Sequence, residues 1–344
     1  MVNKEKATTE YIVTGATGFI GYVVVLELIK KGYAPVKIIT RSEKNLYRFK
    51  DMPVTAAIGD VTDKKFVNAQ ITPGSAIFHL AGVVDIGSVK NKAVHETNVL
   101  GCENIVEACL RNKAKKLIYT SSVSVINPPK SGLISEPTTF DYKGLTGQYA
   151  LSKTRATAYI MDKCKSEGLN AVVVYPTAVI GPYEYNISNI GQVVLDYINR
   201  RLNCYVKGAY DFVDVRDVAA AIVAAYEKGK SGEGYILNGE RVGLDKLFAI
   251  MNKKLKRTKM PLRLPLWFVK AALPLAELYY RVRGKKPVFS SCSIKTLQLN
   301  SRFDNAKARE ELGFNPRPAA ESICDMIDWF FENKKELIKP KYRQ

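Results

Sequence analysis

The chain has 344 residues, of which 47% are hydrophobic and 25% charged, a balance that excludes a disordered or fibrous protein and allows two domains. Its six cysteines contain no C-x-x-C pair and its two histidines, His79 and His95, have no partner at ligand spacing, so we expect reduced cysteines and no metal site. The net charge of +19 is unusual and is not evenly spread along the chain. Residues 1–10 are polar and do not resemble a signal peptide, so we expect a cytoplasmic protein.

The first half of the chain alternates short apolar runs with segments of helical length. Because apolar runs between helices are typical of strands buried on both faces, the alternation predicts an α/β fold, a doubly wound parallel Rossmann sheet with a smaller C-terminal substrate-binding domain. In such sheets, ligands bind beyond the carboxyl ends of the strands. The predicted strands are Tyr11–Thr14, Val36–Thr40, Val54–Ile58, Ala76–Leu80, Lys116–Thr120 and Ala171–Tyr175, and the clearest helices are 94–111 and 148–167.

A glycine-rich turn follows the first strand at once and leads into an apolar helix. Gly15 permits a tight turn, Gly18 lets the backbone approach a phosphate, and Gly21 lets the helix pack closely on the strand. The free N–H groups and the positive dipole end of that helix favour an anion. Glycines at this spacing also occur in structural turns, but the strand–turn–helix setting predicts a dinucleotide site formed by Gly15, Thr17, Gly18, Phe19, Ile20 and Gly21.

The regular alternation weakens after Pro176. We expect helices at 190–201 and 214–228, a strand at 234–239, and helices and loops from 243 to 313. The predicted domains are a dinucleotide-binding Rossmann domain at 1–178, to which 209–239 returns, a substrate-binding domain formed by 179–208 and 240–330, and a basic tail at 331–344.

Residues 253–286 carry eleven Lys and Arg residues and one acid, Glu277. They surround the apolar run 264–280, which is short for a membrane span and holds two prolines and two charges. One interpretation is a helical lid over a substrate pocket, with solvated lysines around it. The other is a peripheral contact with the anionic inner face of a membrane, because basic and aromatic residues favour that interface. We expect no nucleic-acid partner, since the charge does not lie in a known nucleic-acid module.

Two polar clusters near strand ends could carry chemistry. Thr120 ends the fifth predicted strand and Ser121 and Ser122 follow it. Tyr149 and Lys153 are four residues apart on the next helix, which places them on one helical face. A phenol beside an ammonium group can give and take a proton near neutral pH, because a positive charge favours the phenolate and lowers the pKa of the tyrosine. A serine hydroxyl can then hold the substrate oxygen.

Seven short motifs complete the pattern. They are T-G-A-T-G-F-I-G at 14–21, G-D-V at 59–61, H-L-A-G at 79–82, Y-T-S-S at 119–122, Y-A-L-S-K at 149–153, Y-P-T-A-V-I-G-P at 175–182 and D-V-R-D-V-A at 214–219. With them, nearly the whole chain resembles the extended short-chain dehydrogenase/reductase family, also called the NAD-dependent epimerase/dehydratase family. It looks most like the branch with dihydroflavonol reductases and 3β-hydroxysteroid dehydrogenases, and it also resembles hopanoid-associated sugar epimerases. The resemblance implies an NAD(P)-dependent oxidoreductase.

The resemblance also implies a role for each matching residue. Ser122 would be the triad hydroxyl, with Ser121 as the alternative, and Tyr149 would be the acid/base. Lys153 would hold the nicotinamide ribose and tune Tyr149. Asn98 matches a helix asparagine that is mainly structural. The remaining cofactor contacts implied are Asp60 and Val61 at the adenine, Ala81 and Gly82 along the cleft, Thr120 beside them, and Pro176 and Val179 at the nicotinamide end.

The end of the second strand is expected to select the cofactor. An acid there would bind the ribose 2′-hydroxyl and select NAD, but this chain has Arg41 and Lys44 in that segment. Because cations suit a 2′-phosphate, we expect NADP, with NAD as the alternative. Arg41 could instead stack on the adenine without selecting strongly.

Two departures from the family argue against a nucleotide-sugar substrate. Ala209 and Tyr210 stand where sugar-nucleotide relatives carry an arginine, and residues 176–179 lack their asparagine. The leading hypothesis is therefore an NADPH-dependent reductase of a ketone or aldehyde, with a small carbonyl substrate that is apolar or lipid-like. The alternatives are a sugar or nucleotide-sugar epimerase and a non-catalytic NADP-binding sensor. A homodimer is expected only by analogy with relatives that pair through helices near the tyrosine.

Overall fold

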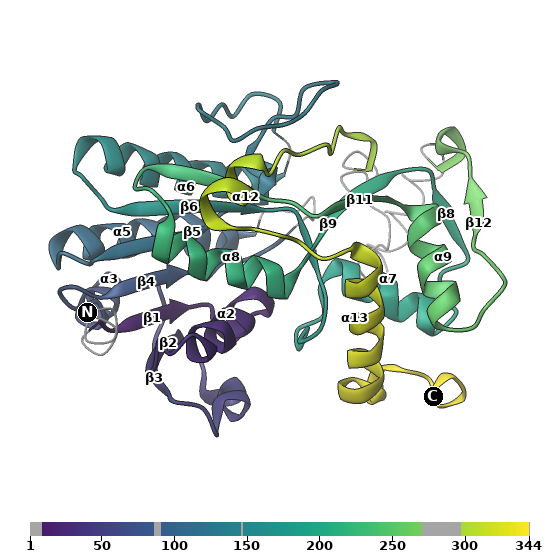
Figure 1. Cartoon of the computed structure of the whole chain (residues 1–344), viewed down its shortest axis with the longest axis horizontal. Helices are drawn as coiled ribbons and strands as arrows, with labels where there is room; N and C mark the ends of the chain where they lie inside the picture. The colour runs from purple at the N-terminus through teal and green to yellow at the C-terminus, as the bar shows by residue number, and fades with distance from the viewer. Residues whose placement is uncertain (1–8, 86–90, 146, 270, 272–296, 344) are drawn as a thin grey trace.

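Seven parallel strands form the central sheet, in the order β10-β6-β5-β4-β1-β2-β3 (Figure 1). The architecture is that of a computed structural model, which describes residues 9–85, 91–145, 147–269, 271 and 297–343. The strand order changes direction between β1 and β4, and ligands bind at such a switch point in open α/β sheets. The strands are β1 Tyr11–Thr14, β2 Val36–Thr40, β3 Val54–Ile58, β4 Ala76–His79, β5 Lys116–Thr120, β6 Ala171–Pro176 and β10 Glu233–Leu237.

The predicted Rossmann sheet is confirmed. Four of the six strands predicted in the first half have the observed bounds, while β4 ends one residue early and β6 continues to Pro176. The strand expected at 234–239 is β10, which pairs with β6 at the edge of the same sheet. The central strands are buried on both faces, which is why their sequences are continuous apolar runs.

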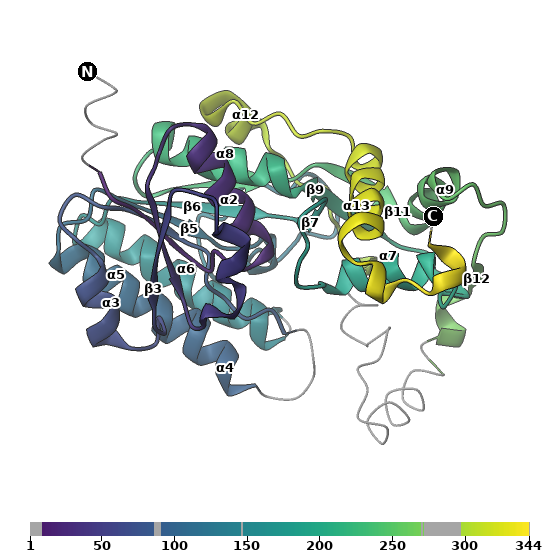
Figure 2. The same ribbon diagram turned by 90° about the horizontal axis from the view of Figure 1, so that it is seen from below.

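Helices cover both faces of this sheet (Figure 2). One face packs against α2 (Phe19–Lys30), α8 (Val215–Lys228) and α12 (Ala306–Leu312), and the other against α3 (Lys64–Gln70), α5 (Gly101–Arg111) and α6 (Gln148–Ser166). The continuous helix expected at 94–111 is wrong. A π-helical turn at Glu96–Leu100 separates α4 (Lys92–His95) from α5, and such turns are frequent at functional sites.

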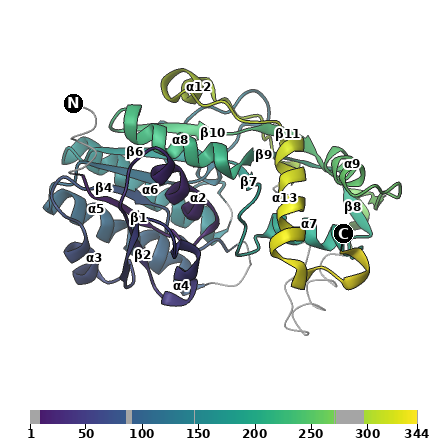
Figure 3. The same cartoon turned by 60° about the horizontal axis from the view of Figure 1, so that its bottom comes forward.

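A smaller lobe with its own apolar core lies beyond one end of the central sheet (Figure 3). Its sheets are β11-β9-β7 and β12-β8. Its strands are β7 Ala178–Ile180, β8 Cys204–Val206, β9 Ala209–Asp214, β11 Glu240–Gly243 and β12 Leu262–Leu264, and its helices are α7 Asn189–Ile198, α9 Leu244–Lys254 and α13 Ala319–Asn333. The expected helix 190–201 therefore ends early, and Arg200 just beyond it adopts a φ of 53°. The predicted domain boundaries stay a prediction.

Part of the basic segment 253–286 falls outside the described residues, namely 270 and 272–286. The predicted lid over 264–280 therefore also lies largely outside them. Within the described ranges, no helix combines the length and the apolar character needed to cross a bilayer. The same ranges hold no group of three His, Cys, Asp or Glu side chains arranged to bind a metal ion.

Candidate active site

In the glycine-rich turn between β1 and α2, the main chain of Gly15 lies close to that of Ala81, and the main chain of Gly21 lies close to that of Gly15. Gly15 has a φ of +72°, and a Cβ added to it would lie 2.6 Å from the Ala81 nitrogen. A Cβ on Gly21 would lie 2.2 Å from the Gly15 carbonyl oxygen, so neither position has room for a side chain. The N-cap residue of α2, Gly18, makes no side-chain cap. Thr17, Phe19 and Ile20 are half-buried along this turn. Because no side chain caps α2, the N–H groups at its start remain available to an anion.

Two side chains that the sequence analysis missed hold this turn. Arg48, from the 3₁₀ helix Glu43–Phe49, and Asn186, from the loop before α7, each donate a hydrogen bond of 3.2 Å to the Thr17 carbonyl oxygen. The Arg48 guanidinium also lies 4.3 Å from the centre of the Tyr185 ring, a cation–π distance. The smaller lobe is thus tied to the turn. The partners are 31 and 169 residues apart in sequence from Thr17, and no local pattern signals such contacts.

The predicted adenine end lies at the carboxyl ends of β2 and β3. Arg41 and Lys44 follow β2 and are exposed, and no acid follows Thr40 directly. Asp60 follows β3 and accepts hydrogen bonds of 2.9 Å from the Thr62 main chain and hydroxyl. Val61 is buried beside it. Two exposed cations and one carboxylate with a local hydrogen-bond partner therefore lie at the same edge of the sheet.

Lys153 lies buried on α6, below the carboxyl end of β5. Its ammonium donates a 2.8 Å hydrogen bond to the Thr120 carbonyl oxygen and a 3.3 Å bond to the Tyr119 hydroxyl. Burial lowers the pKa of Lys153 to about 8. A Cβ on Gly82 would lie 3.5 Å from this ammonium, so Ala81 and Gly82 form the wall opposite it. The sequence prediction that Lys153 and the end of β5 share a site is consistent with these contacts.

Tyr149 lies one helical turn before Lys153, and the neighbouring Ser122 hydroxyl acts to lower the pKa of its phenol. Ser122 is half-buried, whereas Ser121 is buried and bonds to the Thr157 hydroxyl at 2.7 Å. Ser122 is therefore the serine that faces the phenol. The expected lowering of the Tyr149 pKa is wrong: desolvation raises this pKa, and the Ser122 hydroxyl acts in the opposite direction more weakly.

Asn98 fixes the wall of the site from the π-helical turn. Its amide nitrogen donates to the Val83 carbonyl oxygen (3.0 Å) and to the Ser152 hydroxyl (2.9 Å), and its amide oxygen accepts from the Val83 nitrogen at 2.7 Å. A Cβ on Gly82 would lie 3.2 Å from that oxygen. These bonds fit the structural role that the sequence implied for Asn98, since they tie the segment after β4 to α6.

A buried polar network behind Lys153 was not foreseen. His79 bonds through Nδ1 to the Thr14 hydroxyl at 2.7 Å, and its ring stacks on Tyr119 with centroids 5.6 Å apart. Burial, aided by the nearby Lys153 charge, lowers the pKa of His79 to about 3. His79 is therefore neutral at physiological pH, and the ammonium of Lys153 is the one positive charge of this cluster.

The predicted nicotinamide end lies where the two lobes meet. Pro176 ends β6, and Val179 is half-buried in β7. Between them, the Thr177 hydroxyl donates a 2.8 Å bond to Asp211 of β9, which also accepts from the Gly239 nitrogen at 3.0 Å. Burial raises the pKa of Asp211 despite these bonds. Asp211 thus joins β6, β7 and β10 at the site, a role that the sequence analysis did not assign.

Residues 11–238 match the sequence model of the NAD dependent epimerase/dehydratase family. The chain belongs to this family. It is an NAD(P)-binding Rossmann-fold protein, and the resemblance inferred from its motifs is confirmed. The residues of the glycine turn fit a dinucleotide, because the turn presents main chain to a ligand and has no room for a side chain at Gly15 or Gly21.

Individual relatives align with nearly the whole chain. A putative dihydroflavonol 4-reductase of Synechocystis sp. is 28% identical over 333 residues, covering 93% of this chain and 94% of the relative. Sterol demethylase protein B of Methylococcus capsulatus is 26% identical over 325 residues, covering 93% and 98%.

Solved structures share the fold. The crystal structure of gox2253 superimposes with a TM-score of 0.84 and 27% identity, covering 96% of this chain and all of the other. The UDP-glucose 4-epimerase of Thermotoga maritima gives a TM-score of 0.76 at 22% identity, covering 95% and 100%. The second likeness concerns the fold alone.

Proposed function

We propose that the protein is an NADPH-dependent reductase of a ketone or aldehyde. One observation carries the proposal: the buried Lys153 ammonium donates a 2.8 Å hydrogen bond to the carbonyl oxygen of Thr120, two residues before Ser122 and one helical turn after Tyr149, whose pKa the Ser122 hydroxyl acts to lower. These groups lie past the carboxyl end of β5, next to β4 and the glycine turn. A hydroxyl, a proton donor and a fixed cation are what carbonyl reduction requires from the protein.

We assign the cofactor contacts from the same edge of the sheet. Gly15, Thr17, Gly18, Phe19, Ile20 and Gly21 would hold the pyrophosphate, Asp60 and Val61 the adenine, and Ala81, Gly82, Thr120, Pro176 and Val179 the nicotinamide half. Lys153 would bond the nicotinamide ribose with the N–H that its two protein acceptors leave free, since an ammonium has three donors.

Ser122 and Tyr149 would then bind the substrate carbonyl oxygen and protonate it. Ser122 would donate a hydrogen bond to the substrate carbonyl oxygen, and Tyr149 Oη would transfer its proton to that oxygen as negative charge develops there. NADPH, when bound, supplies the hydride. Because desolvation raises the pKa of Tyr149, the phenol carries its proton at neutral pH. In the oxidative direction, the same atom would take the proton back.

Arg41 and Lys44 support NADP rather than NAD. Both side chains are exposed at the end of β2, where the ribose 2′ position is read in this fold. Guanidinium and ammonium groups bind phosphate by charge-assisted hydrogen bonds. We therefore propose that NADPH is preferred, with NADH as a weaker substitute. The homodimer expected by analogy stays a prediction.

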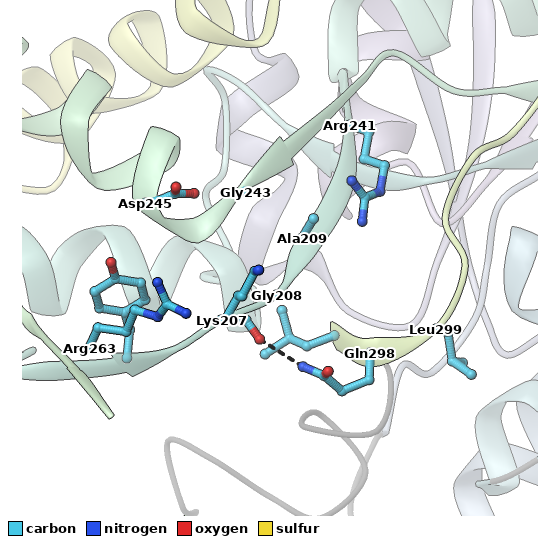
Figure 4. A pocket seen from close by; sticks show the side chains of 11 residues that line it. Lys207, Gly208, Ala209, Arg241, Gly243, Asp245, Arg263, Gln298 and Leu299 are labelled. Carbon is cyan, nitrogen blue, oxygen red and sulfur yellow. Dashed lines mark hydrogen bonds between the residues drawn. The ribbon is translucent and has the colours of Figure 1, made fainter. Parts of the chain in front are cut away.

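A second candidate, an epimerase of a nucleotide sugar or a similar anionic sugar, is favoured by a cavity in the smaller lobe. The cavity has a volume of about 430 Å³ and is lined by three cationic side chains, Lys207, Arg241 and Arg263, and one acid, Asp245 (Figure 4). No ion pair of the three cations with another described residue is found. Arg241 of β11 and Arg263 of β12 would then take the place of the arginine that sugar-nucleotide relatives carry where this chain has Ala209 and Tyr210.

One assay separates the two candidates. Purified protein is incubated with NADPH or NADH and with panels of ketones, aldehydes, sterols and nucleotide sugars. The reductase proposal expects stoichiometric oxidation of NADPH with a carbonyl substrate. Conversion of a nucleotide sugar to its epimer without net consumption of cofactor would instead establish the second candidate. If the protein binds NADPH but catalyses neither carbonyl reduction nor epimerisation, the remaining hypothesis is a non-catalytic NADP-binding sensor.

A further inference from the structure

β12 lies at the end of the molecule farthest from the central sheet (Figures 1 and 2), and exposed apolar side chains lie on it and next to it in the sequence. On β12, Leu262 is 67% exposed, and just beyond it Trp267 is 71% exposed. Met260 and Phe268 are also exposed. Single exposed apolar residues are ordinary, but four within nine positions make a patch that needs an explanation.

Leu262 points away from the cavity of the proposed second candidate, and Met260, Trp267 and Phe268 do not line that cavity. Arg263 lines that cavity, and successive residues of a strand face opposite sides, so Leu262 lies on the other face of β12. β12 pairs only with β8 among the described strands. The patch is therefore an outer edge of the smaller lobe and not part of the substrate cavity.

Cations border this patch. A second cavity of about 430 Å³ next to Met260 is lined by Arg200, Lys256, Arg257 and Lys259, and no acidic side chain lines it. Arg257 is used internally, because it donates two 2.7 Å hydrogen bonds to the carbonyl oxygens that end α7. For the other three, no ion pair with a described residue is found, and Arg200 lies over the Tyr342 ring at 5.5 Å.

We propose that this edge docks on the surface of an anionic lipid bilayer. We define the docking edge as Arg200, Lys256, Lys259, Met260, Leu262, Trp267 and Phe268. The lysines and arginine would lie at the headgroup phosphates, and the apolar side chains would enter the interface, where tryptophan is favoured. Residues 253–269 contain six Lys and Arg residues and no acid, which gives the edge the charge that an anionic surface attracts.

Other occupants fit the observations less well. A second copy of this chain would bring the same cations together across a two-fold interface, and each chain already carries a net charge of +19. A soluble polyanion would bind the cations of the docking edge but would leave the apolar side chains of Leu262 and Trp267 exposed to water. The bilayer surface is the partner that accounts for both the charge and the apolar side chains.

The test uses the full chain and co-sedimentation with vesicles. Vesicles of phosphatidylcholine alone are compared with vesicles in which a third of the lipid is phosphatidylglycerol. We expect binding only to the anionic vesicles and loss of binding at high salt. Lys256→Gln with Lys259→Gln should weaken binding about 30-fold, because each basic residue near an anionic surface contributes about fivefold. The matched control, Lys50→Gln with Lys65→Gln, removes two exposed lysines of the Rossmann half and should have little effect.

Tryptophan fluorescence tests the apolar half of the docking edge. The chain has two tryptophans, and Trp329 is buried against Tyr185, so Trp329→Phe leaves Trp267 as the sole reporter. We expect a blue shift on binding to anionic vesicles and quenching by brominated lipid. Leu262→Ser should reduce binding at least fivefold, with an unchanged melting temperature as the folding control.

Three results would overturn the proposal. They are no binding to anionic vesicles at low salt, equal weakening by the Lys50 and Lys65 control pair, and an emission maximum of Trp267 that does not move on binding. Inorganic polyphosphate is the soluble comparison. If it displaces the protein from vesicles and no Trp267 shift accompanies binding, the edge is a polyanion site and not a membrane surface.

Discussion

The Lys153 ammonium donates a 2.8 Å hydrogen bond to the main-chain carbonyl oxygen of Thr120. This bond joins α6 to the end of β5, two residues before Ser122 and one helical turn after Tyr149. A side chain on a helix is thereby fixed against the strand that carries the serine. The geometry of the proposed site depends on this contact, because it positions the cation without neutralising it.

Replacing Lys153 by methionine tests the contact. The variant keeps an unbranched side chain but removes the charge and the three donors, so we expect kcat/KM to fall by about 100-fold or more and NADPH affinity to fall as well. Steady-state kinetics and cofactor fluorescence titration measure the two effects. Lys165→Met, an exposed position on the same helix, is the control. Unchanged cofactor affinity in Lys153→Met would remove the assigned ribose contact.

Tyr149→Phe removes the proton donor alone. We expect NADPH to bind with nearly unchanged affinity while turnover falls about 10²- to 10⁴-fold, the usual contribution of a positioned acid. Tyr159→Phe on the same helix serves as the control, since Tyr159 lies outside the contacts described for the site. Near-normal turnover in Tyr149→Phe would refute the proposed role of the phenol.

Arg41→Glu addresses the choice of cofactor. Because the variant places a carboxylate beside the proposed 2′-phosphate, we expect KM for NADPH to rise about 10- to 100-fold, in line with the loss of a hydrogen bond to a charged group, while KM for NADH changes little. The ratio of kcat/KM for the two cofactors is the measurement. Lys50→Glu controls for the general change in charge. An unaltered ratio would mean that Arg41 does not read the phosphate.

Glu184 predicts a pH dependence of stability. It is fully buried, its Oε1 accepts a 2.6 Å hydrogen bond from the Ser188 nitrogen, and burial raises its pKa to about 7. The folded state therefore keeps the proton that the unfolded chain releases above about pH 4.5. This contribution is fully present at low pH and is lost as the pH rises through about 7.

Urea unfolding of Glu184→Gln at pH 5 and pH 8 measures that contribution. Glutamine keeps the acceptor for Ser188 and does not titrate. We expect the wild type to lose about 2–3 kcal/mol more than the variant between the two pH values, as 1.36 kcal/mol per pKa unit implies. Glu43→Gln, at an exposed position, should follow the wild type. Parallel losses in wild type and Glu184→Gln would show that Glu184 does not titrate in this range.

Local sequence patterns were sufficient to predict the strands of the central sheet. The strands around Tyr11 and Val36 are apolar runs bounded by glycine or polar residues, and the sheet buries them from both sides, so local composition and tertiary position agree. The helix 94–111 was the exception. Asn98 lies in the π-helical turn and forms hydrogen bonds with Val83 and Ser152. The spacing of apolar residues along the helix does not predict these bonds, so it did not predict the interruption.

Within the proposed site, only the residues that belong to short sequence motifs could be predicted. Tyr149, Lys153 and Ser122 each lie in a recognisable motif. The Tyr149 pKa is nevertheless raised and not lowered, because desolvation outweighs the effect of the Ser122 hydroxyl. Arg48 and Asp211 were missed. Each acts through a partner more than thirty residues away, and such contacts arise from tertiary packing and not from a local pattern along the chain.

Transfer of deuterium from NADPH deuterated at C4 of the nicotinamide tests the central claim most directly. With a carbonyl substrate identified in the screen, mass spectrometry should find one deuterium on the new carbinol carbon, with the wild type and not with Tyr149→Phe. The contradictory result is a wild-type protein that epimerises a sugar and leaves the deuterium on the cofactor after turnover.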